Sequence, residues 1–397
     1  MYPTVSDLIK DIFGIYIPLP IQSFGLFVAI SFIISAFLIM EELKRKENLG
    51  VISVVKKKIL IGKPASASEL LIMALLGFVL GYKLLEIVFN YTYFASNPQT
   101  FIFSSEGNIY GGIIGAFITA YLRYREKQKQ KLEKPYWDEV IVHPFELTGN
   151  IIMYAAVFGI IGSKIFNSLE NIDDFISDPF GSLFSFSGLT FYGGFIIAAI
   201  VIIIYTKKKN IPPLVIADIA APSLILGYAI GRIGCQVAGD GDWGIVNTMI
   251  KPDWLAFLPD WLWAYNYPHN VLSEGIAIPG CVGKHCFMLD PPVFPTPIYE
   301  TIICTLFFII LWSIRKKITT TGVMFAIFLM MNGVERFFIE KIRVNNKYHI
   351  FGKGVTQAEI ISAILFFAGV VLLIYILNKK KKNNSNADNA DITDIRG

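Results

Sequence analysis

The sequence predicts an all-α, polytopic membrane protein of about nine transmembrane helices, with the N-terminus outside and the C-terminus in the cytoplasm. Three observations lead to this prediction. Of the 397 residues, 54% are hydrophobic and only 17% are charged, against roughly 25% charged residues in soluble domains. Apolar runs close to the roughly 20 residues that cross a bilayer recur along the chain. Lysine and arginine are concentrated in alternate loops. These features argue against a soluble enzyme and against nucleic acid as a partner.

The expected helices follow the apolar runs in order. They cover residues 24–40, 70–90, 109–122, 151–166, 191–205, 214–234, 298–314, 321–339 and 358–377. The loops after the first, third, fifth, seventh and ninth runs carry the lysines and arginines, and this alternation sets the orientation. We expect residues 1–378 to form one transmembrane domain without a cleaved signal peptide. The polar tail, residues 379–397, is predicted to be disordered.

A helical hairpin is repeated within this layout, near residues 70–125 and 150–208. Each copy has a Gly-x-Lys segment at the end of its first helix and a Tyr-Gly-Gly segment at the start of its second, at Tyr110 and Tyr192. Both copies have the same orientation, because corresponding helices of the two copies are two apolar runs apart along the chain. This parallel repeat differs from the inverted repeats common in transporters.

Arginine in the sixth apolar run is the first sign of chemistry. Arg232 stands in the glycine-rich stretch from Gly231 through Gly234 to Gly244. It lies about 27 Å along its helix from residue 214, near the outer end. Two interpretations are open: a side chain that snorkels to the lipid headgroups, or part of an anion site.

The eighth run carries a stripe of charged residues. Arg336, Glu340 and Arg343 are spaced i, i+4 and i+7, which places them on one helix face. An ion pair between Arg336 and Glu340 is the purely structural interpretation. Two arginines at a similar depth favour an anion site, because guanidinium groups bind phosphate bidentately and stay charged.

Other polar residues fall at the same outer level. Tyr192 opens the fifth run, and Tyr299 with Glu300 opens the seventh. Tyrosines at helix ends are also typical of the interfacial aromatic belt. The outer segment, residues 235–295, is rich in tryptophan and tyrosine, and could either cover the site and contact a protein substrate or lie on the headgroups. Its Cys281 and Cys286 are close enough in sequence to form a disulfide.

Taken in order, these segments resemble the prolipoprotein diacylglyceryl transferase family over most of the chain. The family's Gly-Arg-x-Gly signature resembles residues 231–244, and its His-Gly-Gly block resembles Tyr192-Gly193-Gly194. Its Pro-x-x-x-Tyr-Glu motif is similar to residues 295–300, and its Arg-x-x-x-Glu-x-x-Arg motif to residues 336–343. This chain departs from the family pattern in carrying Tyr192 for the histidine, Cys235 for an asparagine, one extra residue near Asp240, and the additional hairpin.

The resemblance implies a function and a set of site residues. A diacylglyceryl group would pass from phosphatidylglycerol to the lipobox cysteine of a prolipoprotein, in the bacterial inner membrane. The implied catalytic residues are Arg232, Arg336, Glu340 and Tyr192. The implied substrate-binding residues are Gly193, Gly194, Gly231, Gly234, Gly244, Asp240, Tyr299, Glu300 and Arg343.

No cofactor is implied, and the four histidines show no metal-ligand spacing. Two alternatives stay open: a non-catalytic or altered relative, and a lipid or solute transporter. A transporter would place its polar groups near the middle of the membrane, whereas these lie near one face.

Overall fold

The computed structural model describes residues 1–96, 98–184, 188, 190–345, 347–350 and 353–394. The chain divides into two compact units, which are described separately. The first unit contains residues 1–16, 21–46 and 206–397. The second contains residues 17–20 and 47–205, and it includes both predicted hairpins.

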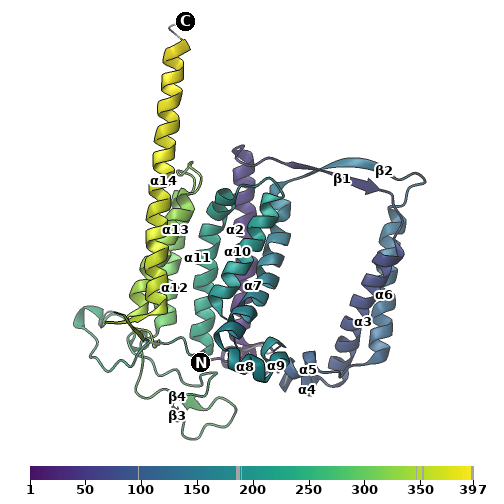
Figure 1. Ribbon diagram of the computed structural model, residues 1–397. Coiled ribbons are helices and arrows are strands. Elements are labelled where there is room, and N and C mark those ends of the chain that lie inside the picture. Colours follow the sequence, from purple (N-terminus) through teal and green to yellow (C-terminus); the bar gives the residue numbers. More distant parts are fainter. Residues whose placement is uncertain (97, 185–187, 189, 346, 351–352, 395–397) are drawn as a thin grey trace. The chain divides into compact units, whose positions relative to one another are not determined.

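Every one of the nine predicted apolar runs lies largely within a helix (Figure 1). These helices are α2 (Ser23–Asn48), α3 (Ala67–Phe89), α6 (Ile109–Lys129), α7 (Thr148–Glu170), α10 (Phe191–Lys207), α11 (Pro213–Ala238), α12 (Thr296–Ile314), α13 (Val323–Glu340) and α14 (Gln357–Asp394). Among the described residues, six are long and apolar enough to cross a membrane: α2, α3, α7 with its preceding turn, α11, α12 and α14. The all-α membrane fold is therefore confirmed, while the count of nine spans and the orientation stay predictions.

The first unit contains a helical bundle in which α11, α12 and α13 surround an apolar core and α14 packs on α13. The core includes Ala221 and Ala229 of α11, Cys304 and Leu311 of α12, and Phe328 of α13. Small residues on α11 allow the neighbouring helices to approach closely. The short amphipathic helix α1 (Val5–Phe13) precedes α2 in the same unit.

Buried carboxylates fix the end of this bundle that is remote from the arginine-bearing helix ends. Glu42 of α2 is paired with Arg45 at 2.6 Å and with Arg315 at 2.9 Å. Asp218 of α11 accepts hydrogen bonds from the backbone N–H groups of Gly322 (2.6 Å) and Phe325 (2.9 Å), and so satisfies free donors at the start of α13. These contacts link α2 to the end of α12, and α11 to the start of α13.

The second unit contains the repeat, in which α3 pairs with α6 and α7 is followed by α10. Each connection folds into two short helices, α4 (Tyr91–Ser96) and α5 (Pro98–Phe103) in the first copy, and α8 (Ile172–Ser177) and α9 (Pro179–Phe184) in the second. Glycines permit the close helix contacts. A Cβ atom on Gly81 would lie 2.1 Å from a carbonyl oxygen of α6, and one on Gly162 would lie 2.5 Å from a carbonyl oxygen of α10.

The lysine of each repeat has a structural role. The ammonium group of Lys83 donates to the carbonyl oxygens of Phe101 (2.7 Å), Ser104 (2.8 Å) and Glu106 (2.7 Å). Lys164 donates to the carbonyl oxygen of Ser182 at 3.2 Å, across the same separation of 18 residues. The two lysines therefore tie the connecting segments to the helix ends in both copies.

Three small sheets and the helical tail complete the fold. Strands β1 (Val55–Ile61) and β2 (Tyr136–Val142) are antiparallel, with Lys58 opposite Glu139. The short pairs β3 (Ile276–Ala277) with β4 (Phe287–Met288), and β5 (Lys347–Ile350) with β6 (Lys353–Thr356), are antiparallel hairpins. The sequence predicts a disordered tail, whereas in the structure α14 continues as far as Asp394. The span already supplies a helical nucleus, and each further residue adds one backbone hydrogen bond to it.

The outer segment between α11 and α12 has its own small core. Trp243, Tyr267, Leu289 and Val293 are buried together, and the Tyr267 hydroxyl donates to Gln236 at 2.7 Å. The 3₁₀ turns η2 (Asp253–Leu255) and η3 (Asp260–Leu262) lie within this segment, and η1 (Pro144–Leu147) precedes α7. Cys281 and Cys286 form a disulfide, as the sequence allowed.

Candidate active site

Three arginines from separate parts of the first unit converge on one carboxylate, Glu300 of α12. Arg232 Nε of α11 lies 2.9 Å from Glu300 Oε2. Arg336 Nη1 of α13 lies 3.2 Å from Glu300 Oε1, and Arg343 Nη1, just after α13, lies 3.4 Å from the same oxygen. The Glu300 side chain has no exposed surface. It is therefore the hub of a buried ion-pair network.

A second carboxylate, Asp242, bridges two of these arginines. One oxygen pairs with Arg232 and the other with Arg343. Burial alone would raise the pKa of Asp242, but the positive charges of both arginines outweigh burial and lower the pKa to about 2. The Asp242 side chain is 33% exposed, against 14% for Arg232 and 9% for Arg343. Asp242 thus forms the accessible edge of the network.

The third carboxylate is Glu340, one turn after Arg336 on α13. Arg336 Nη2 lies 3.1 Å from Glu340 Oε2, so the ion pair that the sequence suggested is present. Asn345 donates to the other Glu340 oxygen at 2.5 Å. We call the six residues of this network the arginine cluster. They are Arg232, Arg336, Arg343, Asp242, Glu300 and Glu340.

The local backbone explains how Asp242 and Arg343 meet. α11 ends at Gly239, whose φ of +63° is a left-handed conformation, and the chain then turns back toward α13. Gly244 forms an antiparallel bridge with Arg343, where a Cβ atom would lie 2.5 Å from the carbonyl oxygen of Ile342. Thr296 at the start of α12 donates to the Asp242 carbonyl oxygen at 2.7 Å. Gly244 is thus required for a close backbone approach.

Tyr228 supports the cluster from within α11. Its hydroxyl donates to Glu300 Oε1 at 3.0 Å, and its ring lies 4.8 Å from the Arg232 guanidinium carbon. Sequence reasoning missed this residue, although its position one turn before Arg232 is the signal that could have found it. The contacts orient Arg232 toward Glu300 and do not match the snorkelling interpretation.

One further buried acid, Glu335, lies next to the arginine cluster. Glu335 precedes Arg336 on α13 and is 2% exposed. Neither of its carboxyl oxygens has a hydrogen-bond partner among the described residues. It too escaped the sequence analysis, because its neighbours on α11 and α12 are distant in the chain.

The structure places Asp240 outside the arginine cluster. Burial first, and then the negative charge of Asp242, raise the pKa of Asp240. Cys235, Asp240 and Asp242 offer ligand atoms within 4.8 Å of one another. Both oxygens of Asp242 are already engaged by arginines, which would repel a cation there. Of the two aspartates in the signature, Asp242 contacts the arginines.

Other predicted site residues have packing roles in the structure. The Tyr299 hydroxyl donates to the carbonyl oxygen of Leu262 at 2.5 Å and so ties the outer segment to α12. Gly193 and Gly194 pack against α7, and Gly234 packs against α2. A Cβ atom on Gly231 would meet no heavy atom within 4 Å.

Tyr192 lies at the start of α10, in the second unit, with its ring 5.7 Å from that of Phe191. Its predicted position opposite Arg232 stays a prediction. The two hairpin copies differ at this end. In the first copy Phe101 is fully buried against Tyr93 and Phe94, with ring centroids 6.3 and 5.4 Å apart.

The second copy has a polar hollow at the corresponding place. Ser182 is the counterpart of Phe101 in the first copy. Lys164 binds the carbonyl oxygen of Ser182, as Lys83 binds that of Phe101. The hollow measures about 310 Å³ and is lined by Asn167, Ser168, Asn171, Asp174, Phe175, Ser182 and Gly188. The Ser168 hydroxyl is buried in it and has no hydrogen-bond partner in the part of the chain that the structure describes. The described residues of the second copy therefore line a polar cavity where the first copy packs aromatic rings.

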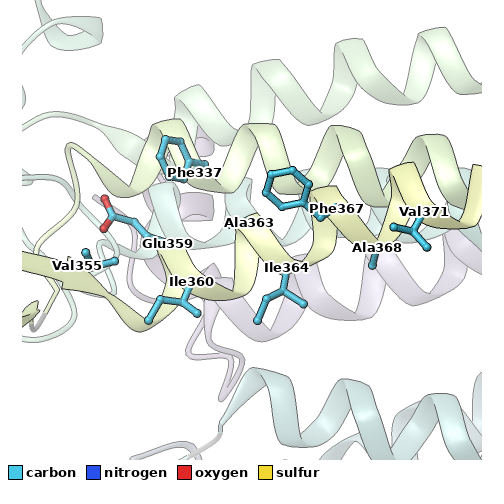
Figure 2. A pocket seen from close by; sticks show the side chains of 9 residues that line it. All are labelled: Phe337, Val355, Glu359, Ile360, Ala363, Ile364, Phe367, Ala368 and Val371. Atoms are coloured by element: carbon cyan, nitrogen blue, oxygen red, sulfur yellow. The ribbon is translucent and has the colours of Figure 1, made fainter. Parts of the chain in front are cut away.

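A separate apolar groove of about 630 Å³ runs along α14 beside α13. Figure 2 shows the Glu359 carboxylate at one end and apolar side chains along the rest of the groove. Glu359 is paired with Lys341 and accepts the Thr356 N–H at 3.0 Å. Among the described lining residues, Glu359 carries the single charge, at the end of the groove where α14 begins, and the others are apolar.

Comparisons with known proteins identify the family of this chain. The family model described as "Prolipoprotein diacylglyceryl transferase" matches residues 10–144 and 134–375. Three similar relatives are each named phosphatidylglycerol–prolipoprotein diacylglyceryl transferase. One, from Leptospira interrogans, is 26% identical over 322 residues, which cover 69% of this chain and 90% of the relative.

The others are from Staphylococcus haemolyticus and Oceanobacillus iheyensis. The first is 30% identical and covers 57% of this chain and 72% of the relative. The second is 26% identical, and the match covers 67% of this chain and 83% of the relative. The matched residues contain the whole arginine cluster. The resemblance seen in the sequence is confirmed, and the chain belongs to the prolipoprotein diacylglyceryl transferase family.

Proposed function

We propose that this protein transfers a diacylglyceryl group from phosphatidylglycerol to the lipobox cysteine of a prolipoprotein. We place it in the inner membrane of a bacterium, with the arginine cluster at the outer face, as the alternation of basic loops indicates. The bilayer, the lipid and the prolipoprotein are then its partners.

The position of the arginine cluster along its helices is the observation that carries this proposal. Arg232 is six residues from the end of α11, about 9 Å, and Glu300 is four residues from the start of α12, about 6 Å. Glu340 is the last residue of α13. The charges thus lie at the ends of the spans, where phospholipid headgroups are, and not at mid-membrane as in a transporter.

The charge balance indicates how a lipid phosphate enters. Three arginines are paired with three carboxylates, so none is left for an anion in the structure as it stands. Asp242 is the most exposed member and spans two guanidinium groups, as a phosphate does. Glycines with positive φ, Gly239 (+63°) and Gly241 (+96°), precede it. We infer that the lipid phosphate displaces the Asp242 carboxylate and pairs with Arg232 and Arg343.

The reaction then breaks the bond between the glycerol carbon of the diacylglyceryl group and the phosphate oxygen. The cysteine sulfur forms the new bond to that carbon, its proton passes to an acceptor, and glycerol phosphate leaves. Arg232, Arg336 and Arg343 stabilise the charge of the leaving phosphate. Arginine cannot serve as the base, because it stays protonated in proteins. Glu340 is the acceptor that we propose, since two arginines lower the pKa of Asp242 to about 2 and make it a weak base.

The second hairpin is the copy we assign to the lipid site. Its polar hollow supports this assignment, since the first copy fills the same place with aromatic side chains. Tyr192 is proposed as a hydrogen-bond donor to the lipid. With a reference pKa near 10 it is better suited to donate than to accept a proton.

A defined lipid and peptide mixture tests the proposal. Purified protein in vesicles that contain phosphatidylglycerol is incubated with a lipobox peptide, and the peptide is weighed by mass spectrometry. We expect a diacylglyceryl increment on the cysteine. Arg232→Lys, which loses the planar fork, and Arg336→Ala, which leaves Glu340 unpaired, should abolish or severely reduce the increment.

Arg315→Lys is the matched control. This arginine also lies in a buried ion pair, with Glu42, but at the opposite end of the bundle. At equal membrane abundance it should retain activity. A folded wild-type protein that never modifies the peptide would indicate a non-catalytic relative. Full turnover in Arg232→Lys would remove the arginine cluster from the mechanism.

A further inference from the structure

The outer segment contains a short tandem repeat that the transfer reaction does not use. Pro252-Asp253-Trp254-Leu255 is followed by Pro259-Asp260-Trp261-Leu262. Each copy forms one 3₁₀ turn, η2 and η3. We call residues 245–263 the tryptophan loop.

The tryptophan loop is held in one conformation by its own polar contacts. Lys251 donates to the Leu258 carbonyl oxygen at 2.8 Å and pairs with Asp260 at 2.6 Å. The Trp263 ring N–H donates to the Met249 carbonyl oxygen at 2.9 Å. Asn247 donates to the Trp263 carbonyl oxygen at 2.7 Å and so closes the base of the loop.

This ordered backbone displays large apolar side chains to the surroundings. Ile250 is 94% exposed, Phe257 78% and Trp254 74%. Met249 and Trp261, at 59% and 44%, flank them. A folded loop gains nothing from exposing such side chains to water, and an exposed apolar patch of this kind marks a binding surface.

The tryptophan loop lies at the end of a membrane-spanning helix. The Tyr299 hydroxyl, in the first turn of α12, bonds to the Leu262 carbonyl oxygen at 2.5 Å, and α12 is one of the candidate spans. Trp263 packs on Phe294, with ring centroids 5.8 Å apart. These contacts place the loop at the boundary between hydrocarbon and water, where tryptophan is enriched.

The shape of the loop favours lipid as its occupant. Ile250, Trp254 and Phe257 are each at least 74% exposed and protrude, whereas a peptide-binding groove would enclose its side chains. One lysine and two aspartates leave the loop with a net charge of −1, so attraction to anionic headgroups does not hold it. We propose that the tryptophan loop is a membrane-docking surface that inserts Ile250, Trp254 and Phe257 into the bilayer interface beside the start of α12.

Spin labels on single introduced cysteines test this proposal directly. Ile250→Cys, Trp254→Cys and Phe257→Cys are labelled in the full-length protein and reconstituted into phosphatidylcholine vesicles. The native Cys235 and Cys304 are buried, and Cys281 and Cys286 are bonded to each other, so none competes for the label. Collisions with oxygen, which concentrates in the bilayer, are compared with collisions with a water-soluble nickel chelate.

We expect all three labels to collide more with oxygen than with nickel. Glu274→Cys, at another exposed position of the outer segment, is the control and should show the reverse. Strong nickel collisions at all three positions would overturn the proposal. Labels that become protected only after a lipobox peptide is added would also overturn it, in favour of a peptide surface. The vesicles contain no phosphatidylglycerol, so failure of transfer does not affect the result.

Discussion

Glu300→Gln is the substitution that tests the arginine cluster most directly. Glutamine keeps the shape of the side chain but removes the negative charge shared by three guanidinium groups at 2.9, 3.2 and 3.4 Å. It can accept the Tyr228 hydroxyl but cannot balance the arginines. Loss of one partner of a buried ion pair costs about 3–5 kcal/mol.

The expected cost lies at the lower end of this range, because two carboxylates of the arginine cluster remain. Asp242 still bridges Arg232 and Arg343, and Glu340 still pairs with Arg336. We therefore expect the free energy of unfolding to fall by about 3 kcal/mol. Diacylglyceryl transfer should be lost as well, since all three arginines lose a common positioning contact.

Denaturant unfolding in detergent micelles, followed by tryptophan fluorescence, measures the effect. Glu139→Gln is the matched control, because its carboxylate is half-exposed and lies 3.9 and 3.6 Å from Lys56 and Lys58. Such surface pairs contribute about 0–1 kcal/mol. If Glu300→Gln costs no more than this control, the carboxylate is not the hub that the distances indicate.

Three further predictions concern other parts of the molecule. Tyr192→Phe should cut transfer by more than about tenfold, or 1.4 kcal/mol, while Tyr110→Phe stays near wild type in the same peptide assay; the reverse order would assign the lipid site to the first hairpin. The depressed pKa of Asp242 stabilises the folded state fully above the unfolded value near 3.8 and is lost as pH falls through about 2. The stability that Asp242→Asn removes should therefore be constant from pH 7 to about 5, and thermal unfolding in detergent would contradict this if the difference shrank already above pH 5. Thiol alkylation of the unfolded protein should label two more sites after reduction than before, from Cys281 and Cys286, and equal labelling would exclude the bridge.

The sequence alone was enough for features that depend on neighbours along the chain. Apolar runs gave the helices, because each span must satisfy its backbone internally and face lipid. The spacing of Arg336 and Glu340 predicted a pair on one helix face, and that pair is present at 3.1 Å. The family resemblance likewise depended on ordered local motifs, and the family model that matches residues 10–144 and 134–375 confirms the family.

The partners within the arginine cluster needed the tertiary structure. Nothing local shows that Glu300 of α12 meets arginines of α11 and α13, since those contacts join residues far apart in sequence. The family resemblance implied Asp240, and not Asp242, as a substrate-binding residue. In the structure the chain turns at Gly239, and Asp242 is the aspartate that pairs with Arg232 and Arg343. Only the structure shows that the Tyr299 hydroxyl bonds to the Leu262 carbonyl oxygen, while its role toward substrate stays a prediction. A motif fixes which side chains a helix carries, whereas the packing of helices decides which of them meet.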